Sequence, residues 1–97
     1  MRDVKRFEIL IETLHAPKAQ KALEELGVRG YAVLRDVAGN HDGSVRDGDG
    51  VTNVDQLTWI VATCPAEIES QLAERLRPML RRYGGSCVVS DARRLEL

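Results

Sequence analysis

Two strand-like runs, residues 30–37 and 56–63, flank a glycine-rich segment that is too long for an ordinary hairpin turn. This segment reads GNHDGSVRDGDG over residues 39–50 and holds four of the chain's eight glycines. Because a hairpin turn needs only about two to five residues, a connection this long is usually functional or disordered. Glycine backbones can curl their N–H groups around an anion, and Arg46 is the only lysine or arginine in the segment. The segment is therefore either an anion-binding loop or a flexible, solvated one.

The patterns before the segment predict a strand and then a helix. Residues 4–13 alternate, with Phe7, Ile9 and Ile11 on one face, which is typical of a strand. Residues 17–27 begin with proline, carry apolar side chains at helical spacing and end on glycine, which predicts a helix.

A second helix and a short strand are predicted after the third strand. The helix begins at Pro65 and carries apolar side chains at helical spacing as far as Tyr83. Pro78 should kink this helix or free the Glu74 carbonyl. Gly84-Gly85 ends it, residues 86–90 form the fourth strand, and the charged tail 91–97 should be ordered only by docking.

This order of elements, β-α-β-β-α-β, predicts a single ferredoxin-like α+β domain over residues 1–97. In that fold the strand order is 4-1-3-2, two helices cover one face of an antiparallel sheet, and the long segment is the tip of the second hairpin. Residues 56–63 are apolar on both faces, with Leu57, Trp59 and Val61 opposite Ile60 and Ala62. We therefore expect the face without helices to pack against another subunit.

Composition excludes several classes of function. A net charge of −1 and few aromatic residues argue against nucleic-acid binding. No apolar stretch reaches the roughly 20 residues that cross a bilayer, and the N-terminus lacks a signal-peptide core, so we expect a cytoplasmic protein. Cys64 and Cys87 lack metal-ligand spacing and should be reduced thiols.

The sequence shows no set of residues typical of a catalytic site. Acylphosphatases share the predicted fold and bind an anion with an arginine on the loop after the first strand. At that place this chain has Leu14-His15-Ala16-Pro17, which contains no arginine.

Two motifs resemble the PII signal-transduction superfamily. The run Leu26-Gly27-Val28-Arg29-Gly30-Tyr31-Ala32-Val33 is similar to that family's turn between the first helix and the second strand. The run Gly43-Ser44-Val45-Arg46 is similar to the loop of PII-like proteins associated with bicarbonate transport and carboxysomes. The resemblance covers essentially the whole chain.

The resemblance implies a homotrimer that binds ADP, AMP or ATP in clefts between its subunits, without a covalent cofactor. Residues 39–53 would be the T-loop, which closes over the phosphates and signals to a partner. Bicarbonate is implied as a possible second ligand, and the partner would be a membrane bicarbonate transporter or a carboxysome-linked protein. The nucleotide-binding residues implied are Arg29, Gly30, Gly39, Gly43, Ser44, Arg46, Gly84, Gly85, Arg93 and Arg94.

Several alternatives stay open. Gly84-Gly85 can be a plain helix stop, and Arg93-Arg94 can be a solvated pair.

Three departures from the family argue against tyrosine modification and nitrogen-type 2-oxoglutarate sensing. Residues 39–53 hold no tyrosine, the family's lysine-bearing loop before the last strand is reduced to Gly84-Gly85-Ser86, and Arg29 stands at a position that is commonly threonine in the family. The alternative function is a trimeric metal-binding protein of the divalent-cation-tolerance type, although the acidic residues near His41 do not have EF-hand spacing.

Overall fold

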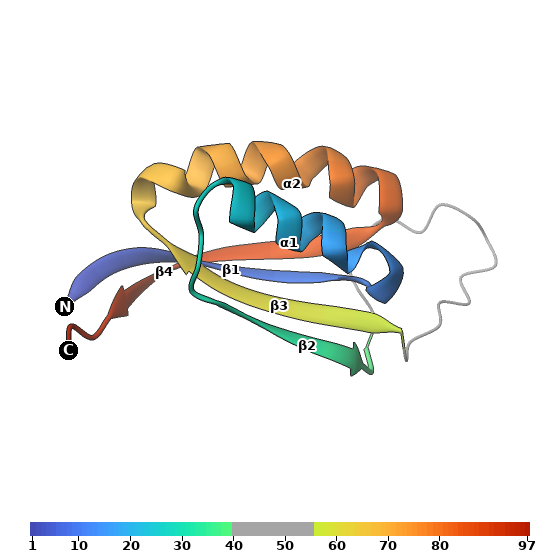
Figure 1. Cartoon of the computed structure of the whole chain (residues 1–97), viewed down its shortest axis with the longest axis horizontal. Helices are drawn as coiled ribbons and strands as arrows, with labels where there is room; N and C mark the ends of the chain where they lie inside the picture. Colours follow the sequence, from blue (N-terminus) through green and yellow to red (C-terminus); the bar gives the residue numbers. More distant parts are fainter. Residues whose placement is uncertain (40–55) are drawn as a thin grey trace.

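The computed structural model describes residues 1–39 and 56–97, which form a four-stranded sheet and two α-helices (Figure 1). In chain order the elements are β1 (Arg2–Glu12), α1 (Ala16–Glu25), β2 (Tyr31–Val37), β3 (Leu57–Cys64), α2 (Glu69–Tyr83) and β4 (Gly85–Arg94). Short 3-10 turns, Thr13–His15 and Ala66–Ile68, precede the two helices.

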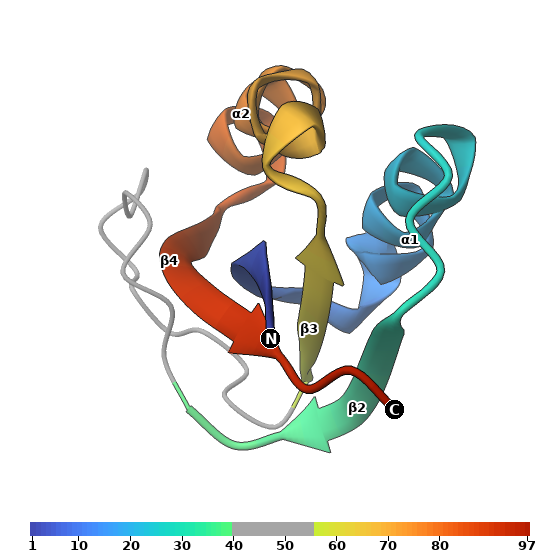
Figure 2. The same cartoon turned by 90° about the vertical axis from the view of Figure 1, so that its left-hand side faces the viewer.

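The strands lie in the order β2-β3-β1-β4, and every neighbouring pair is antiparallel. Both helices cover the same face of this sheet, as the turned view in Figure 2 shows. The predicted ferredoxin-like α+β fold and its strand order are therefore confirmed.

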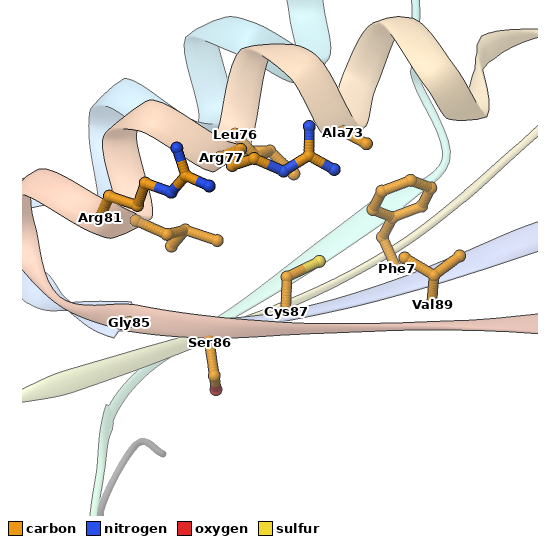
Figure 3. Close-up of a pocket in the computed structure, with 10 residues that line it drawn as sticks. Phe7, Ala73, Leu76, Arg77, Arg81, Gly85, Ser86, Cys87 and Val89 are labelled. Carbon is orange, nitrogen blue, oxygen red and sulfur yellow. The ribbon is translucent and has the colours of Figure 1, made fainter. Parts of the chain in front are cut away.

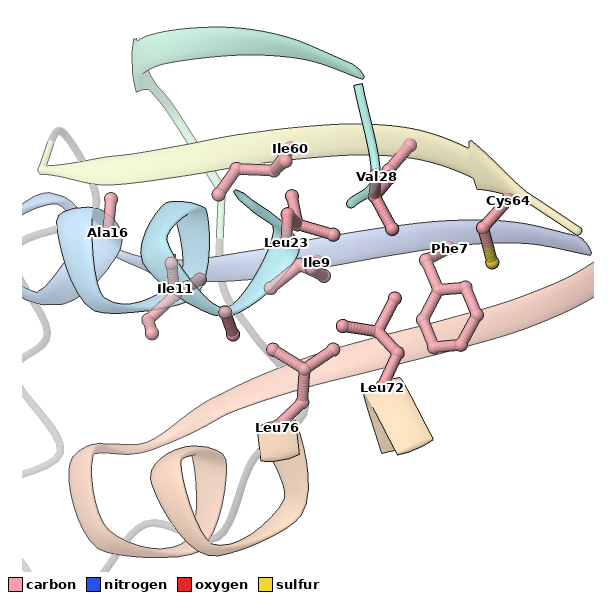
Figure 4. Packing of buried hydrophobic residues seen from close by; sticks show 13 residues of the cluster. Phe7, Ile9, Ile11, Ala16, Leu23, Val28, Ile60, Cys64, Leu72 and Leu76 are labelled. Carbon is pink, nitrogen blue, oxygen red and sulfur yellow. The ribbon is translucent and has the colours of Figure 1, made fainter. Parts of the chain in front are cut away.

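The core lies between the sheet and the helices, and it follows the predicted alternation. Phe7, Ile9 and Ile11 are fully buried on β1 and face Leu72 and Leu76 of α2 (Figure 4). Burying a side chain of this size stabilises the fold by about 1.5–3 kcal/mol. The period of two from Phe7 to Ile11 thus decides which face of the sheet the helices cover.

The helices begin and end close to the predicted positions. Glycine at position 27 adopts a φ of 78° just after α1, and the Val28 N–H donates to the Leu23 carbonyl at 2.9 Å to close the cap. The second helix begins at Glu69 rather than at Pro65, because a 3-10 turn comes first. It continues through Pro78 to Tyr83.

The face of the sheet without helices is also apolar. Trp59 and Val61 of β3 are half-buried there, and Leu34 of β2 and Val88 of β4 are 44% and 60% exposed. Ile60 and Ala62, the alternate residues of β3, are buried beneath the helices. The prediction that β3 is apolar on both faces is confirmed, and no element among the described residues covers the second face.

The predicted end of β4 was wrong. The strand continues beyond Ser90 to Arg94 and pairs with the first residues of β1, so most of the supposed tail is part of the sheet. Lys5 and Asp91 stand directly opposite each other, and their side chains form an ion pair at 2.5 Å. An opposite-charge pair across two antiparallel strands stabilises their pairing, so a charged run of this kind can be a strand.

Candidate functional site

Three residues meet at the end of the sheet where β2 begins and β3 ends. The Gly30 carbonyl accepts a hydrogen bond from the Thr63 N–H at 3.1 Å, and the Arg94 guanidinium donates to the Thr63 hydroxyl. A Cβ placed on Gly30 would lie 3.1 Å from Arg94 Nη2, closer than most real contacts. Glycine at position 30 therefore leaves room for the arginine, and we call Gly30, Thr63 and Arg94 the Arg94 cluster.

Arg93 does not join the Arg94 cluster. Successive side chains of a strand point to opposite faces, and Arg93 lines a separate hollow with Lys5 and Asp91. Lys5 is charged there, and its hydrogen bond to Asp91 raises the pKa of its ammonium group further. The two neighbouring arginines therefore cannot be treated as one basic pair.

Arg29 is exposed on the turn beside the Arg94 cluster. It lines a shallow hollow with Glu24, Gly27 and Tyr31. The Tyr31 hydroxyl donates to Glu24 Oε2 at 2.8 Å, and this bond raises the pKa of the tyrosine. Arg29 thus lies at the same end of the sheet as Arg94.

The other predicted glycines lie at the opposite end of the sheet, where β4 begins. Gly84 has a φ of 79°, which favours glycine, and its N–H donates to the Leu80 carbonyl at 2.9 Å. A Cβ on Gly85 would lie 2.8 Å from both the Leu10 carbonyl oxygen and Leu80 Cδ2. Both positions therefore require glycine for the fold itself, whether or not their N–H groups also bind a ligand.

The predicted loop residues continue from this second end. Gly39 lies just beyond the end of β2 and is exposed. Gly43, Ser44 and Arg46 fall outside the described residues.

The two groups of candidate residues are far apart within one chain. Gly85 pairs with Ile11 and Arg94 pairs with Arg2, so the groups lie near opposite ends of β4. The nine steps from Gly85 to Arg94 along this ten-residue strand span about 30 Å. One chain therefore does not bring all the described candidates into a single cleft.

Sequence reasoning missed Thr63, which holds Arg94 in place. Alternation along β3 places this side chain on the face without helices, beside Val61. Its contact with Arg94 depends on β4 reaching residue 94, which the local pattern did not indicate.

The cysteines and the acidic residues give no sign of a metal centre in the part of the chain that the structure describes. Cys64 and Cys87 are free thiols on β3 and β4, which are not neighbours in the sheet. No group of three or more histidine, cysteine, aspartate or glutamate side chains is placed to hold a metal among residues 1–39 and 56–97. Neither helix of the described chain is long and apolar enough to cross a membrane.

The family model described as "Nitrogen regulatory protein P-II" matches residues 4–96. The chain belongs to the P-II family. This confirms the resemblance to the PII superfamily and identifies the chain as one of a family of regulatory proteins. It also favours the PII-like function over the divalent-cation alternative.

Solved structures extend this result. A P-II-like protein from Thiomonas intermedia K12, CPII bound to ADP, AMP and acetate, is 27% identical over 98% of this chain and 91% of that chain, with a TM-score of 0.79. CPII bound to ADP, AMP and bicarbonate is 28% identical over 93% of this chain and 86% of that chain, with a TM-score of 0.75. The B. subtilis GlnK–ATP complex shows the shared fold alone, at 17% identity over 95% and 84% of the chains and a TM-score of 0.64. No curated protein matches the sequence.

Proposed function

We propose that this P-II family member is a non-enzymatic, cytoplasmic regulator that binds ADP, AMP or ATP in clefts between the subunits of a homotrimer. Bicarbonate is the proposed second ligand. Residues 39–53 would act as a T-loop that reports the bound ligand to a bicarbonate transporter or a carboxysome-linked protein. The main observation in support of the proposal is that the candidate residues lie in two groups at opposite ends of the sheet.

The apolar second face of the sheet supports a trimer. In a monomer, Leu34 and Val88 would remain exposed on this face, with Trp59 and Val61 half-buried beside them. Apolar patches of this kind usually mark an interface. A closed ring of three subunits would cover all three such faces around one axis.

A ring would also bring the two groups of candidate residues close together, because each group would come from a different subunit. In a head-to-tail arrangement, one end of each subunit meets the opposite end of the next. Gly84, Gly85 and the 39–53 segment of one subunit could then face the Arg94 cluster of its neighbour. A nucleotide between them would have glycine N–H groups on one side and a guanidinium on the other.

The ligands are proposed from chemistry and from the CPII structures. Arg94 donates to Thr63, and its planar fork has further N–H donors that match the geometry of a phosphate. CPII, which is 27–28% identical to this chain, was solved with ADP and AMP, and also with bicarbonate. Adenine nucleotide and bicarbonate are therefore the first ligands to test.

Two neighbouring arginines provide a matched test. Arg94→Ala should weaken ADP binding about tenfold to a hundredfold in calorimetric titration, because a charge-assisted hydrogen bond is lost. Arg93→Ala removes the same charge from the other face of β4 and should leave the affinity within about threefold. Equal affinities for Arg94→Ala and the wild type would contradict the proposed site, as would a larger loss for Arg93→Ala.

A further inference from the structure

A groove of about 340 Å³ runs between α2 and β4, on the face of the sheet that the helices cover (Figure 3). Ala73, Leu80 and Val89 form the accessible part of its apolar lining, above the buried side chains of Phe7 and Leu76. The Cys87 side chain points from β4 toward α2, whereas Ser86 points away.

The groove exists because small residues occupy the beginning of an edge strand. β4 is the last strand of the sheet, and α2 buries Leu72 and Leu76 in the core between sheet and helices. On the helix-covered side, β4 presents Gly85 and Cys87 beneath the flank of α2. Gly85 is already in close contact with Leu80, but Cys87 is too small to fill the space between β4 and α2, so the hollow remains open.

Two arginines of α2 lie over this groove. Arg77 and Arg81 are one helical turn apart, both are exposed, and both line the hollow. Within residues 1–39 and 56–97, neither forms an ion pair or a hydrogen bond, whereas Arg75 on the same helix pairs with Glu25. Cations near a helix C-terminus are favourable, but two like charges at i and i+4 repel each other. An anion between the two guanidinium groups would remove this repulsion.

The thiol in the groove adds no negative charge. Burial, with a smaller contribution from Glu8, raises the pKa of Cys87 to about 11, so the side chain is neutral at pH 7. The groove therefore combines a neutral, largely apolar lining with two unpaired cations at its rim.

We propose that the α2–β4 groove binds a small organic anion with an apolar body and a carboxylate or phosphate head. The head would lie between Arg77 and Arg81, since a guanidinium can bind either group through two parallel hydrogen bonds. The apolar body would lie along Ala73, Leu80 and Val89, which line the groove and are not fully buried. Ligand pockets are typically about 300–1,000 Å³ and mostly apolar with few polar groups, so this groove is of a size for a short alkyl chain.

The groove shares Gly85 with the loop end of the proposed nucleotide cleft, but the side chains proposed to bind its anion, Arg77 and Arg81, belong to neither side of that cleft. The Arg94 cluster lies near the far end of β4, and the probes below contain no adenine or ribose. Titration with these probes and titration with ADP therefore test the two proposals separately.

The test titrates the full chain with octanoate and with octyl phosphate, and follows backbone amide signals by NMR. At least one of these two anions should shift the amide signals of Cys87 and Val89 until the signals saturate. The difference between the two affinities shows whether the groove prefers a carboxylate or a phosphate head. Octanol, which has no charge, and inorganic phosphate, which has no apolar body, should each bind at least tenfold more weakly.

Matched variants then test the residues. The double variant Arg77→Ala/Arg81→Ala should weaken binding at least tenfold, while Arg75→Ala, on another face of the same helix, should change it less than twofold. Cys87→Leu, which fills the groove without altering charge, should also weaken binding. Equal binding by the double variant and the wild type, shifts confined to other residues, or no binding of either anion would overturn the proposal. The proposal would also be overturned if the Cys87 and Val89 signals shifted in the same way when only the protein concentration was changed. A second copy of the chain would then occupy the groove.

Discussion

Mixed trimers built from two defective variants should recover nucleotide sites that neither variant forms alone. The first variant, Arg46→Ala, disables the proposed T-loop end of each subunit. The second, Arg94→Ala, disables the Arg94 cluster at the opposite end. Because about 30 Å of β4 separates Gly85 from Arg94, the proposed cleft combines the loop end of one subunit with the Arg94 end of its neighbour.

The expected recovery follows from this geometry. In either homotrimer every cleft has one defective side, and its ADP affinity should fall about tenfold to a hundredfold. In an equal random mixture, a cleft is intact when an Arg94→Ala subunit supplies the loop end and an Arg46→Ala subunit supplies the arginine. About a quarter of the clefts in the random mixture are then intact, which is about one of the three clefts in each trimer that contains both variants, so trimers purified through both tags should bind about one ADP each with normal affinity.

The assay is calorimetric titration of ADP into trimers co-expressed with two different tags and purified through both. High-affinity binding in the mixed preparation, absent from each homotrimer, is the expected result. If the mixed trimers bind ADP no better than the two homotrimers, the cleft is not shared between subunits and the reasoning fails.

Two further predictions concern stability and thiol chemistry. Gly85→Ala should lower the free energy of unfolding by about 1–3 kcal/mol in urea melts at fixed protein concentration, because the new Cβ meets the Leu10 carbonyl, while Ser86→Ala should have little effect. A Gly85→Ala variant as stable as the wild type would show that β1 and β4 can separate freely. At pH 8, iodoacetamide should alkylate Cys87 about a hundredfold more slowly than a free cysteine, because its pKa is raised to about 11. Alkylation of Cys87 at the rate of a free cysteine would contradict the account. Because the raised pKa favours the neutral thiol in the folded state, Cys87 should stabilise the fold below about pH 9, and this contribution should be lost as the pH rises toward 11.

The fold was predictable because its determinants are local. Alternation at Phe7, Ile9 and Ile11 identified the buried face of β1, and the order of strands and helices indicated the topology. The end of β4 was not predictable in this way. Its stability depends on pairing with the distant residues Arg2–Lys5 and on the Lys5–Asp91 ion pair, so the local pattern resembled a solvated tail.

The candidate site was predictable only in part. The turn at Gly30 and the glycines before β4 were identified by type and position, but their separation across the sheet appears only in the folded chain. The difference between Arg93 and Arg94 follows from strand alternation once β4 is known to include them. The α2–β4 groove brings together residues of α2 and of β4, and their contact is set by the packing of the folded chain rather than by a local pattern.

Native mass spectrometry of the wild-type chain with ADP tests the central claim most directly, because it reads assembly and ligand binding together. We predict a trimer that takes up as many as three ADP molecules as the nucleotide concentration rises. A chain that stays monomeric, or a trimer that takes up no ADP at concentrations well above the micromolar range, would contradict the account.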